Sequence, residues 1–253
     1  MSSSTLAIHS REEHIRYLAL AAGALLVLPF VPFGNFVLYP FMILSTWFHE
    51  MGHGLTAVTM GFDFERLVLL PDGSGFAQYS FPESAGRFSH AVVAASGPMG
   101  PAMVGSALIL ASPHEKLWRP ALYTLAAVIG VSTVIWVRSL LGWIVLPGIA
   151  LLLVLIATRG SPTLERFTLQ FLGLQAALSM FQQWDYLMVE SAVIAGREQL
   201  SDTGAIEAYL LLPHWLWAGL IIGLAALMIG ASLRYALSEG RIPTDWQTRI
   251  PRR

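Results

Sequence analysis

Three ionisable side chains stand close together near residue 50. His49 and His53 are four positions apart and Glu50 follows the first of them, so the segment has the pattern His-Glu-x-x-His. On a helix, residues four apart lie on the same face, and both imidazoles can therefore bind one zinc ion. Glu50 is rotated by about 100° around the helix, from where its carboxylate can act as general base on a metal-bound water. The predicted chemistry is zinc-assisted hydrolysis.

The position of this motif favours a functional role. Residues 36–60 are predominantly apolar, and ionisable groups within such a segment are costly in a bilayer. A chance match has a probability under about 1% at the His and Glu frequencies of this chain. The alternative is a structural role, in which these side chains only pair with their neighbours. Gly52 and Gly54 remove bulk beside the motif and allow a backbone or a substrate to approach closely.

The composition is typical of a membrane protein. Of the 253 residues, 55% are hydrophobic and 12% are charged, whereas about 25% charged residues is usual for a soluble domain. The net charge is -1 and no basic cluster is present, so we expect no nucleic-acid partner. Because the chain has no cysteine, a metal would have to be held by His, Asp or Glu. Zn²⁺ is the expected cofactor and the lipid bilayer the expected surroundings.

Seven apolar stretches approach the roughly 20 residues that a membrane-spanning helix needs. They cover residues 17–33, 36–60, 88–111, 118–137, 139–158, 164–185 and 214–236. We therefore expect an all-α membrane protein, a polytopic bundle of about six or seven transmembrane helices. It would form a single domain over residues 1–253, with the catalytic core at about 36–111 plus 164–213. The expected location is the cell membrane, as a multi-pass protein.

Two regions do not have the character of spanning helices. Residues 61–87 contain two β-prone runs around Pro71-Asp72-Gly73-Ser74-Gly75, and Asp-Gly between such runs predicts a β-hairpin. Residues 186–213 mix acidic residues with a Ser-Asp-Thr-Gly turn, which indicates an interfacial segment.

The chain resembles the site-2 protease family of intramembrane zinc metalloproteases. The resemblance rests on His49-Glu50-Met51-Gly52-His53 in a hydrophobic span, the short hairpin region after it, and Ala95-Ser96-Gly97-Pro98 opening the next span. It covers residues 36–111 well. It implies that His49 and His53 are zinc ligands, that Glu50 is the catalytic glutamate and that the substrates are membrane proteins. Many members of the family have an Asn three residues after the Gly-Pro pair, where this chain has Pro101; this difference indicates a divergent branch.

A third ligand must come from elsewhere in the chain, because catalytic zinc typically has three protein ligands plus water. The Leu-Asp-Gly motif that usually supplies it in the family is absent. Asp185 is the preferred candidate. It ends the sixth predicted span, and even-numbered spans run in the same direction, so it would lie at the same membrane face as His49 and His53. Alternatively, Asp185 only caps a helix at the interface.

Asp202 is the second candidate, either as a ligand or as a partner of a ligand. Its setting, Ser201-Asp202-Thr203-Gly204, is also ordinary for a turn. Three glutamates are weaker candidates: Glu190, Glu198 and Glu207. Two histidines that flank spans, His90 and His214, are interpreted as interfacial side chains.

Cleavage inside a membrane requires an unwound substrate, because helical carbonyls are already hydrogen-bonded within their own segment. The predicted hairpin over residues 64–81 could pair its edge with an extended substrate; alternatively it only connects two helices. Two other functions remain open. The chain could be a membrane scaffold or transporter that retains a metal-binding motif, or a zinc hydrolase that acts on lipid.

Overall fold

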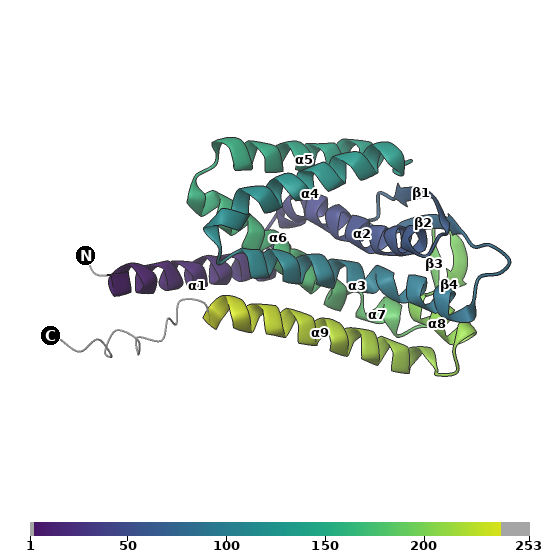
Figure 1. The fold of residues 1–253 in the computed structure, drawn as a ribbon. Coiled ribbons are helices and arrows are strands. Elements are labelled where there is room, and N and C mark those ends of the chain that lie inside the picture. Colours follow the sequence, from purple (N-terminus) through teal and green to yellow (C-terminus); the bar gives the residue numbers. More distant parts are fainter. Residues whose placement is uncertain (1–2, 239–253) are drawn as a thin grey trace.

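Long apolar segments form long helices in the structure, a computed structural model that describes residues 3–238 (Figure 1). The helices longer than 18 residues are α1 (Ser3–Val27), α2 (Gly34–Thr59), α3 (Arg87–Ala111), α4 (Glu115–Ile135), α5 (Leu140–Arg159), α6 (Pro162–Gln182) and α9 (His214–Ser238). Each of the seven predicted stretches overlaps one of these helices over most of its length. The protein is therefore an all-α polytopic membrane protein, as the sequence predicts, and it has two small hairpins where one was predicted.

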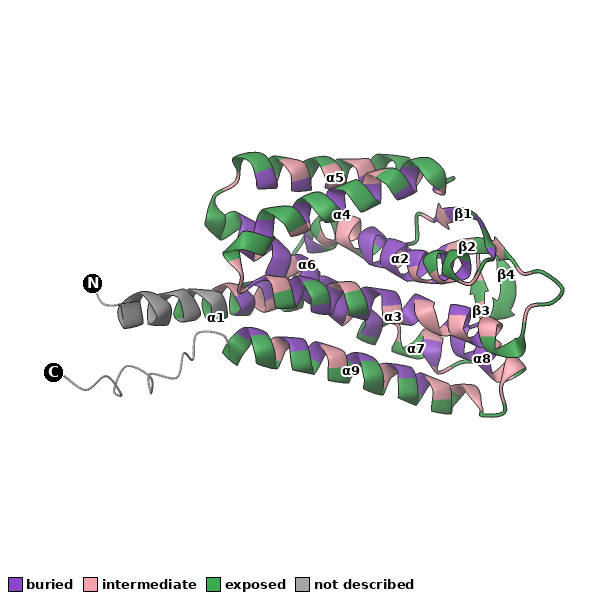
Figure 2. Ribbon diagram, viewed as in Figure 1, coloured by how far each residue is buried: buried purple, intermediate pink, exposed green. Residues whose placement is uncertain are grey.

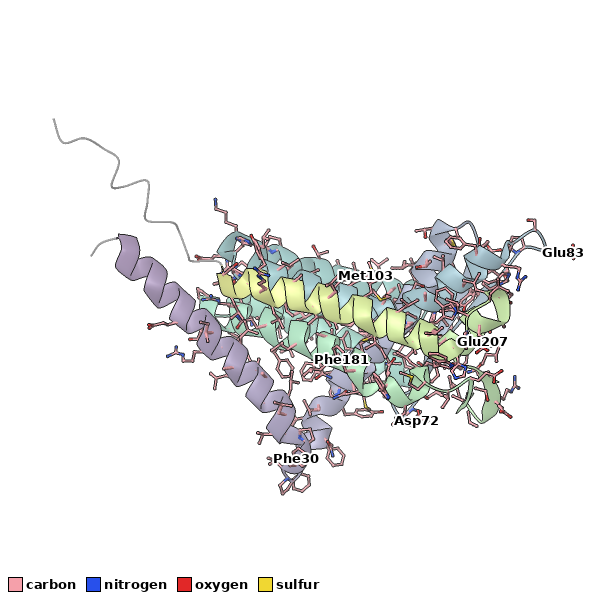
Figure 3. All side chains as sticks on the ribbon, turned by 90° about the horizontal axis from the view of Figure 1, so that it is seen from below. Phe30, Asp72, Glu83, Met103, Phe181 and Glu207 are labelled. Atoms are coloured by element: carbon pink, nitrogen blue, oxygen red, sulfur yellow. The ribbon has the colours of Figure 1, made fainter. Side chains whose placement is uncertain are left out.

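Fewer helices than expected are both long and apolar enough to cross a membrane. Within the described residues, these are α3, α4, α5 and α9. A fifth span is possible from α1 and α2, which satisfy the criteria only as a pair bent by 118°. The short 3-10 helix η1 (Leu28–Phe30) lies at this bend, and Figure 3 shows α1 leaving the bundle at an angle with Phe30 at the bend.

Helices α2 and α6 are less apolar because they lie inside the bundle. Helix α6 buries Glu165, Arg166, Gln170 and Gln175, and α2 buries the motif residues. Figure 2 shows buried residues along α2 and α3, whereas α5 and α9 expose much of their outer surface. A helix that neighbouring helices shield from lipid can hold polar side chains at lower cost. A criterion based on mean hydropathy therefore does not select either of these two helices by itself.

The contact between α2 and α3 is especially close. A Cβ atom at Gly52 would overlap the carbonyl oxygen of Ser96. The Ser96 hydroxyl oxygen lies 3.0 Å from Gly52 O and 2.6 Å from Val93 O. Small residues thus bring the backbones of the two helices together at the level of the motif.

The first hairpin confirms the prediction for residues 64–81. Strands β1 (Asp63–Leu69) and β2 (Gly75–Ser80) are antiparallel, with Leu67 opposite Ala77. The turn is closed by a hydrogen bond from Leu70 N to Ser74 O of 2.8 Å. The outer edge of β1 is already occupied, because Leu67 N donates to Trp136 O (2.8 Å) and Leu67 O accepts from Arg138 N (2.9 Å).

The predicted interfacial region folds into further short elements. Helix α7 (Trp184–Leu187) is followed by antiparallel strands β3 (Ser191–Ile194) and β4 (Arg197–Leu200), and then by α8 (Asp202–Tyr209). The hairpin turn holds Ala195 and Gly196 at positive φ, 54° and 74°. A hairpin was not expected because this turn lacks an Asn-Gly or Asp-Gly pair and its strands are only four residues long. In Figure 1, β3, β4 and α8 lie at the same end of the bundle as β1 and β2.

Candidate metal centre

The His-Glu-x-x-His motif lies in the second half of α2, facing the interior of the protein. His49 and His53 are each 5% exposed and Glu50 is 7% exposed. The imidazole Nε2 atoms of the two histidines are 3.2 Å apart. The helical spacing therefore brings both rings to one point, as the motif predicts.

Asp202, about 150 residues after the motif in the sequence, contacts both imidazoles. Its Oδ2 lies 3.0 Å from His49 Nε2, and its Oδ1 lies 3.2 Å from His53 Nε2. Burial opposes a charge on this carboxyl, but the imidazoles of His53 and His49 outweigh that effect and hold the pKa of Asp202 below its usual range. Among the described residues, His49, His53 and Asp202 form a group whose ligand atoms all lie within 4.8 Å of one another.

The position of Asp202 is fixed by its two neighbours at the start of α8. Ser201 caps the helix by accepting a hydrogen bond from Gly204 N (3.0 Å). Its hydroxyl donates to Val189 O at 2.5 Å, and Thr203 Oγ1 donates to Leu187 O at 2.7 Å. The Ser-Asp-Thr-Gly sequence therefore holds the carboxylate toward α2 rather than forming an ordinary surface turn.

The tautomer of His53 is set by the helix α3 backbone. Its Nδ1 lies 2.8 Å from Val93 O, and a carbonyl oxygen can only accept. In the neutral ring Nε2 then carries a lone pair, and this lone pair faces the Asp202 carboxylate. Two acceptors at this distance repel each other, so the contact requires either a proton on Nε2 or a metal cation between them.

The ligand atoms fit a zinc ion. Tetrahedral zinc with bonds of about 2.0–2.1 Å places its ligand atoms about 3.3–3.4 Å apart. In the structure the two Nε2 atoms are 3.2 Å apart, and each lies 3.0 or 3.2 Å from a different oxygen of the Asp202 carboxylate. Two imidazoles and one carboxylate are also a donor set that zinc commonly takes in catalytic sites. His49, His53 and Asp202 can therefore hold the ion and leave one position open.

The preferred third ligand from the sequence does not reach this group. Asp185 is exposed on α7, and it is not part of the ligand cluster. The structure brings Asp202, the second candidate, into contact with both imidazoles and leaves Asp185 outside that group. The physical reason is one of precision. The end of a predicted span shows only at which membrane face a residue lies, whereas metal binding requires the carboxylate to be placed, relative to the imidazoles, to within about an ångström.

The weaker candidates lie outside the cluster as well. Glu190 and Glu198 are exposed. Glu207 accepts a hydrogen bond from the backbone N of His214 and pairs with its ring Nδ1, both at 2.7 Å; these hydrogen bonds lower the pKa of Glu207. His90 packs between aromatic rings, 3.7 Å from the ring centre of Phe81 and 4.3 Å from that of Tyr209.

Glu50 lies beside the ligands without belonging to the cluster. It faces β2, where a Cβ atom at Gly75 would lie 3.3 Å from Glu50 Cγ and where the backbone of Ala77 interacts with the carboxylate. Leu67 directs its backbone groups away from β2, so its partner Ala77 also directs its own groups outward. The outward edge of β2 is therefore the edge that meets Glu50.

Two tyrosine rings flank the centre, and sequence reasoning had missed both. Tyr186 of α7 lies 6.4 Å from the His49 ring, and Tyr79 of β2 lies 6.2 Å from the His53 ring. Burial raises the pKa of each hydroxyl, and the charges of Asp202 and Glu50 raise it further. Both are therefore neutral hydrogen-bond donors. Only the predicted hairpin, which contains Tyr79, gave a signal for either residue.

Fold and centre together define a helical membrane protein that buries a candidate metal site beside a carboxylate. The model of the Peptidase M50B-like family matches residues 17–232. The chain belongs to this peptidase family, and the resemblance to the site-2 proteases is confirmed. Comparison with curated proteins gives no match, and comparison with solved structures gives none either.

Proposed function

We propose that the protein is an intramembrane zinc metalloprotease that hydrolyses peptide bonds of membrane-protein substrates. The observation that carries this proposal is the convergence of His49, His53 and Asp202 beside Glu50 within the helical bundle. Membership in a peptidase family supports it. Its location would be the cell membrane, which membrane fractionation would check.

The metal would be held by His49, His53 and Asp202. When bound there, zinc supplies a Lewis acid that lowers the pKa of water toward about 7 and polarises a carbonyl group. Glu50 takes the proton from the attacking water and returns it to the leaving amine nitrogen. The new C–O bond forms at the scissile carbonyl carbon, and the C–N bond breaks.

The substrate would reach Glu50 along the open edge of β2. The edge of β1 is occupied by Trp136 and Arg138, whereas β2 has no second strand partner in the part of the chain that the structure describes. An extended substrate that pairs with β2 takes over the Ala77 backbone group. The Glu50 carboxylate is then released for proton transfer.

The experiment is a Glu50→Gln substitution, assayed with a panel of single-span proteins and of lipids. We expect wild-type protein to cut a protein substrate and Glu50→Gln to lose at least about 10²–10⁴-fold in turnover. Because Glu50 is not in the ligand cluster, its zinc content should be unchanged. Glu83→Gln, at an exposed loop position, is the matched control and should keep full activity.

Two results would contradict the proposal. A Glu50→Gln variant that cuts as fast as wild type would remove the catalytic role of the motif. Wild-type protein that binds zinc but cuts no protein would instead favour a scaffold or transporter, and turnover of lipid alone would favour a lipid hydrolase.

A further inference from the structure

One face of strand β2 lies against the side of α2 that carries Glu50 and His53. The side-chain position of Gly75 points at this helix, since a Cβ there would lie 2.9 Å from Thr46 Cγ2 and 3.3 Å from Glu50 Cγ. Side chains at every second residue of a strand share a face, so the side chain of Tyr79 follows on the same side. It ends beside His53, one turn further along α2, with 6.2 Å between the ring centres.

The Tyr79 ring is held in place while its hydroxyl remains free. The ring packs edge-on against Phe81 at 5.3 Å. The ring centre lies 6.2 Å from that of His53, and the negative charges of Asp202 and Glu50 both raise the pKa of the hydroxyl. No described residue forms a hydrogen bond with it.

Tyr186 provides the contrast within the same site. Its ring packs edge-on against His49, and its oxygen faces the backbone N–H of Asp202 as an acceptor. Tyr186 therefore packs against His49 from the short helix α7. Of the two side chains, Tyr79 is the one that stands on β2, the strand with an open edge.

We propose that Tyr79 is a catalytic residue whose hydroxyl donates a hydrogen bond to the scissile carbonyl oxygen as that oxygen becomes negatively charged. The proposal rests on the proposed protease function. When the water oxygen bonds to the carbonyl carbon, the π electron pair of the C=O group moves onto the oxygen. Tyr79 keeps its proton throughout, and the electron pair returns when the C–N bond breaks.

The physical basis is electrostatic stabilisation in a buried site. A donor that is already oriented toward the developing charge stabilises the transition state more than the neutral carbonyl. A phenol with an ordinary pKa near 10 is protonated at neutral pH, so Tyr79 can act as this donor. Its position on β2 places it next to any strand that pairs with the open edge.

The experiment is Tyr79→Phe, which keeps the ring and its packing but removes the hydroxyl. We expect turnover to fall by about 10²–10³-fold, with KM and zinc content unchanged. A second measurement is independent of turnover. A phosphinate peptide, which carries a tetrahedral oxyanion, should bind Tyr79→Phe more weakly than wild type by a similar factor. A substrate peptide should bind the Glu50→Gln protein and the Glu50→Gln, Tyr79→Phe double variant equally well.

Tyr123→Phe is the matched control, because this side chain is 41% exposed on α4; it should match wild type in both measurements. If wild type is active and Tyr79→Phe equals it in turnover and phosphinate affinity, the role of Tyr79 is overturned and the protease function stands. If wild type is as inert as Glu50→Gln, the proposed function is overturned, and the role of Tyr79 with it.

Discussion

His49 and His53 differ in how their rings are held. His53 is oriented by the Val93 carbonyl, an arrangement that fixes the tautomer of metal-binding histidines. The buried Nδ1 of His49 has no hydrogen-bond partner among the described residues, and its ring is instead packed against Tyr186. We infer that His53 is the more rigid of the two ligands.

At the scale of single residues, the sequence identified three of the four groups at the centre. His49, Glu50 and His53 are separated by fixed helical angles, so their spacing alone predicts a shared face. Asp202 was only the second candidate, because its position depends on hydrogen bonds from Ser201 and Thr203 to a segment that is distant from α2 in the sequence. The available signal was the pair of hydroxyl residues around an aspartate at a helix start.

At the scale of elements, α3 shapes the site through a glycine. A Cβ atom at Gly97 would overlap Nε2 of His53, so the imidazole occupies the space that a side chain would need. In the sequence, Gly97 stands out as part of Ala95-Ser96-Gly97-Pro98, which opens the span after the hairpin. Its contact with the ligand could not be read from spacing within one helix.

We therefore expect Gly97→Ala to displace the His53 ring and to weaken zinc binding by at least about 10–100-fold. Titration of the metal-free protein with zinc would measure this. Gly130→Ala is the matched control, because a Cβ at Gly130 meets nothing within 4 Å; it should bind zinc as wild type does. Equal affinity of the two variants would show that α3 does not confine the ligand.

The open edge of β2 gives a second prediction at this scale. Proline at position 77 removes the backbone N–H that points outward, so Ala77→Pro should lose substrate binding and cleavage while zinc content stays unchanged. Binding is measured in the Glu50→Gln protein, where no cleavage interferes. Ala77→Ser keeps the N–H and should bind as before. Undiminished binding by Ala77→Pro would exclude strand pairing at this edge.

The hairpin of β1 and β2 was predictable, but the hairpin of β3 and β4 was not. An Asp-Gly turn between two β-prone runs is a strong local signal. Ala195-Gly196 gives no such signal, although both residues adopt positive φ. Helix α8 was missed for a similar reason, since its eight residues are too few for a clear periodic pattern.

At the scale of the whole molecule, hydropathy predicted the fold class but not the number of spans. Helices α2 and α6 are enclosed by their neighbours and bury polar residues, so their composition differs from that of a lipid-exposed helix. Both hairpins and α8 lie together at one end of the bundle (Figure 1). The topological argument selected Asp185, whereas the proposed third ligand, Asp202, comes from the short helix α8.

The most direct test is the zinc content of purified wild-type, Asp202→Asn and Asp185→Asn proteins. If α2 and α8 together build the metal centre, wild type and Asp185→Asn each retain one zinc ion per chain after dialysis, whereas Asp202→Asn loses it. Retention of zinc by Asp202→Asn together with its loss from Asp185→Asn would contradict this metal centre.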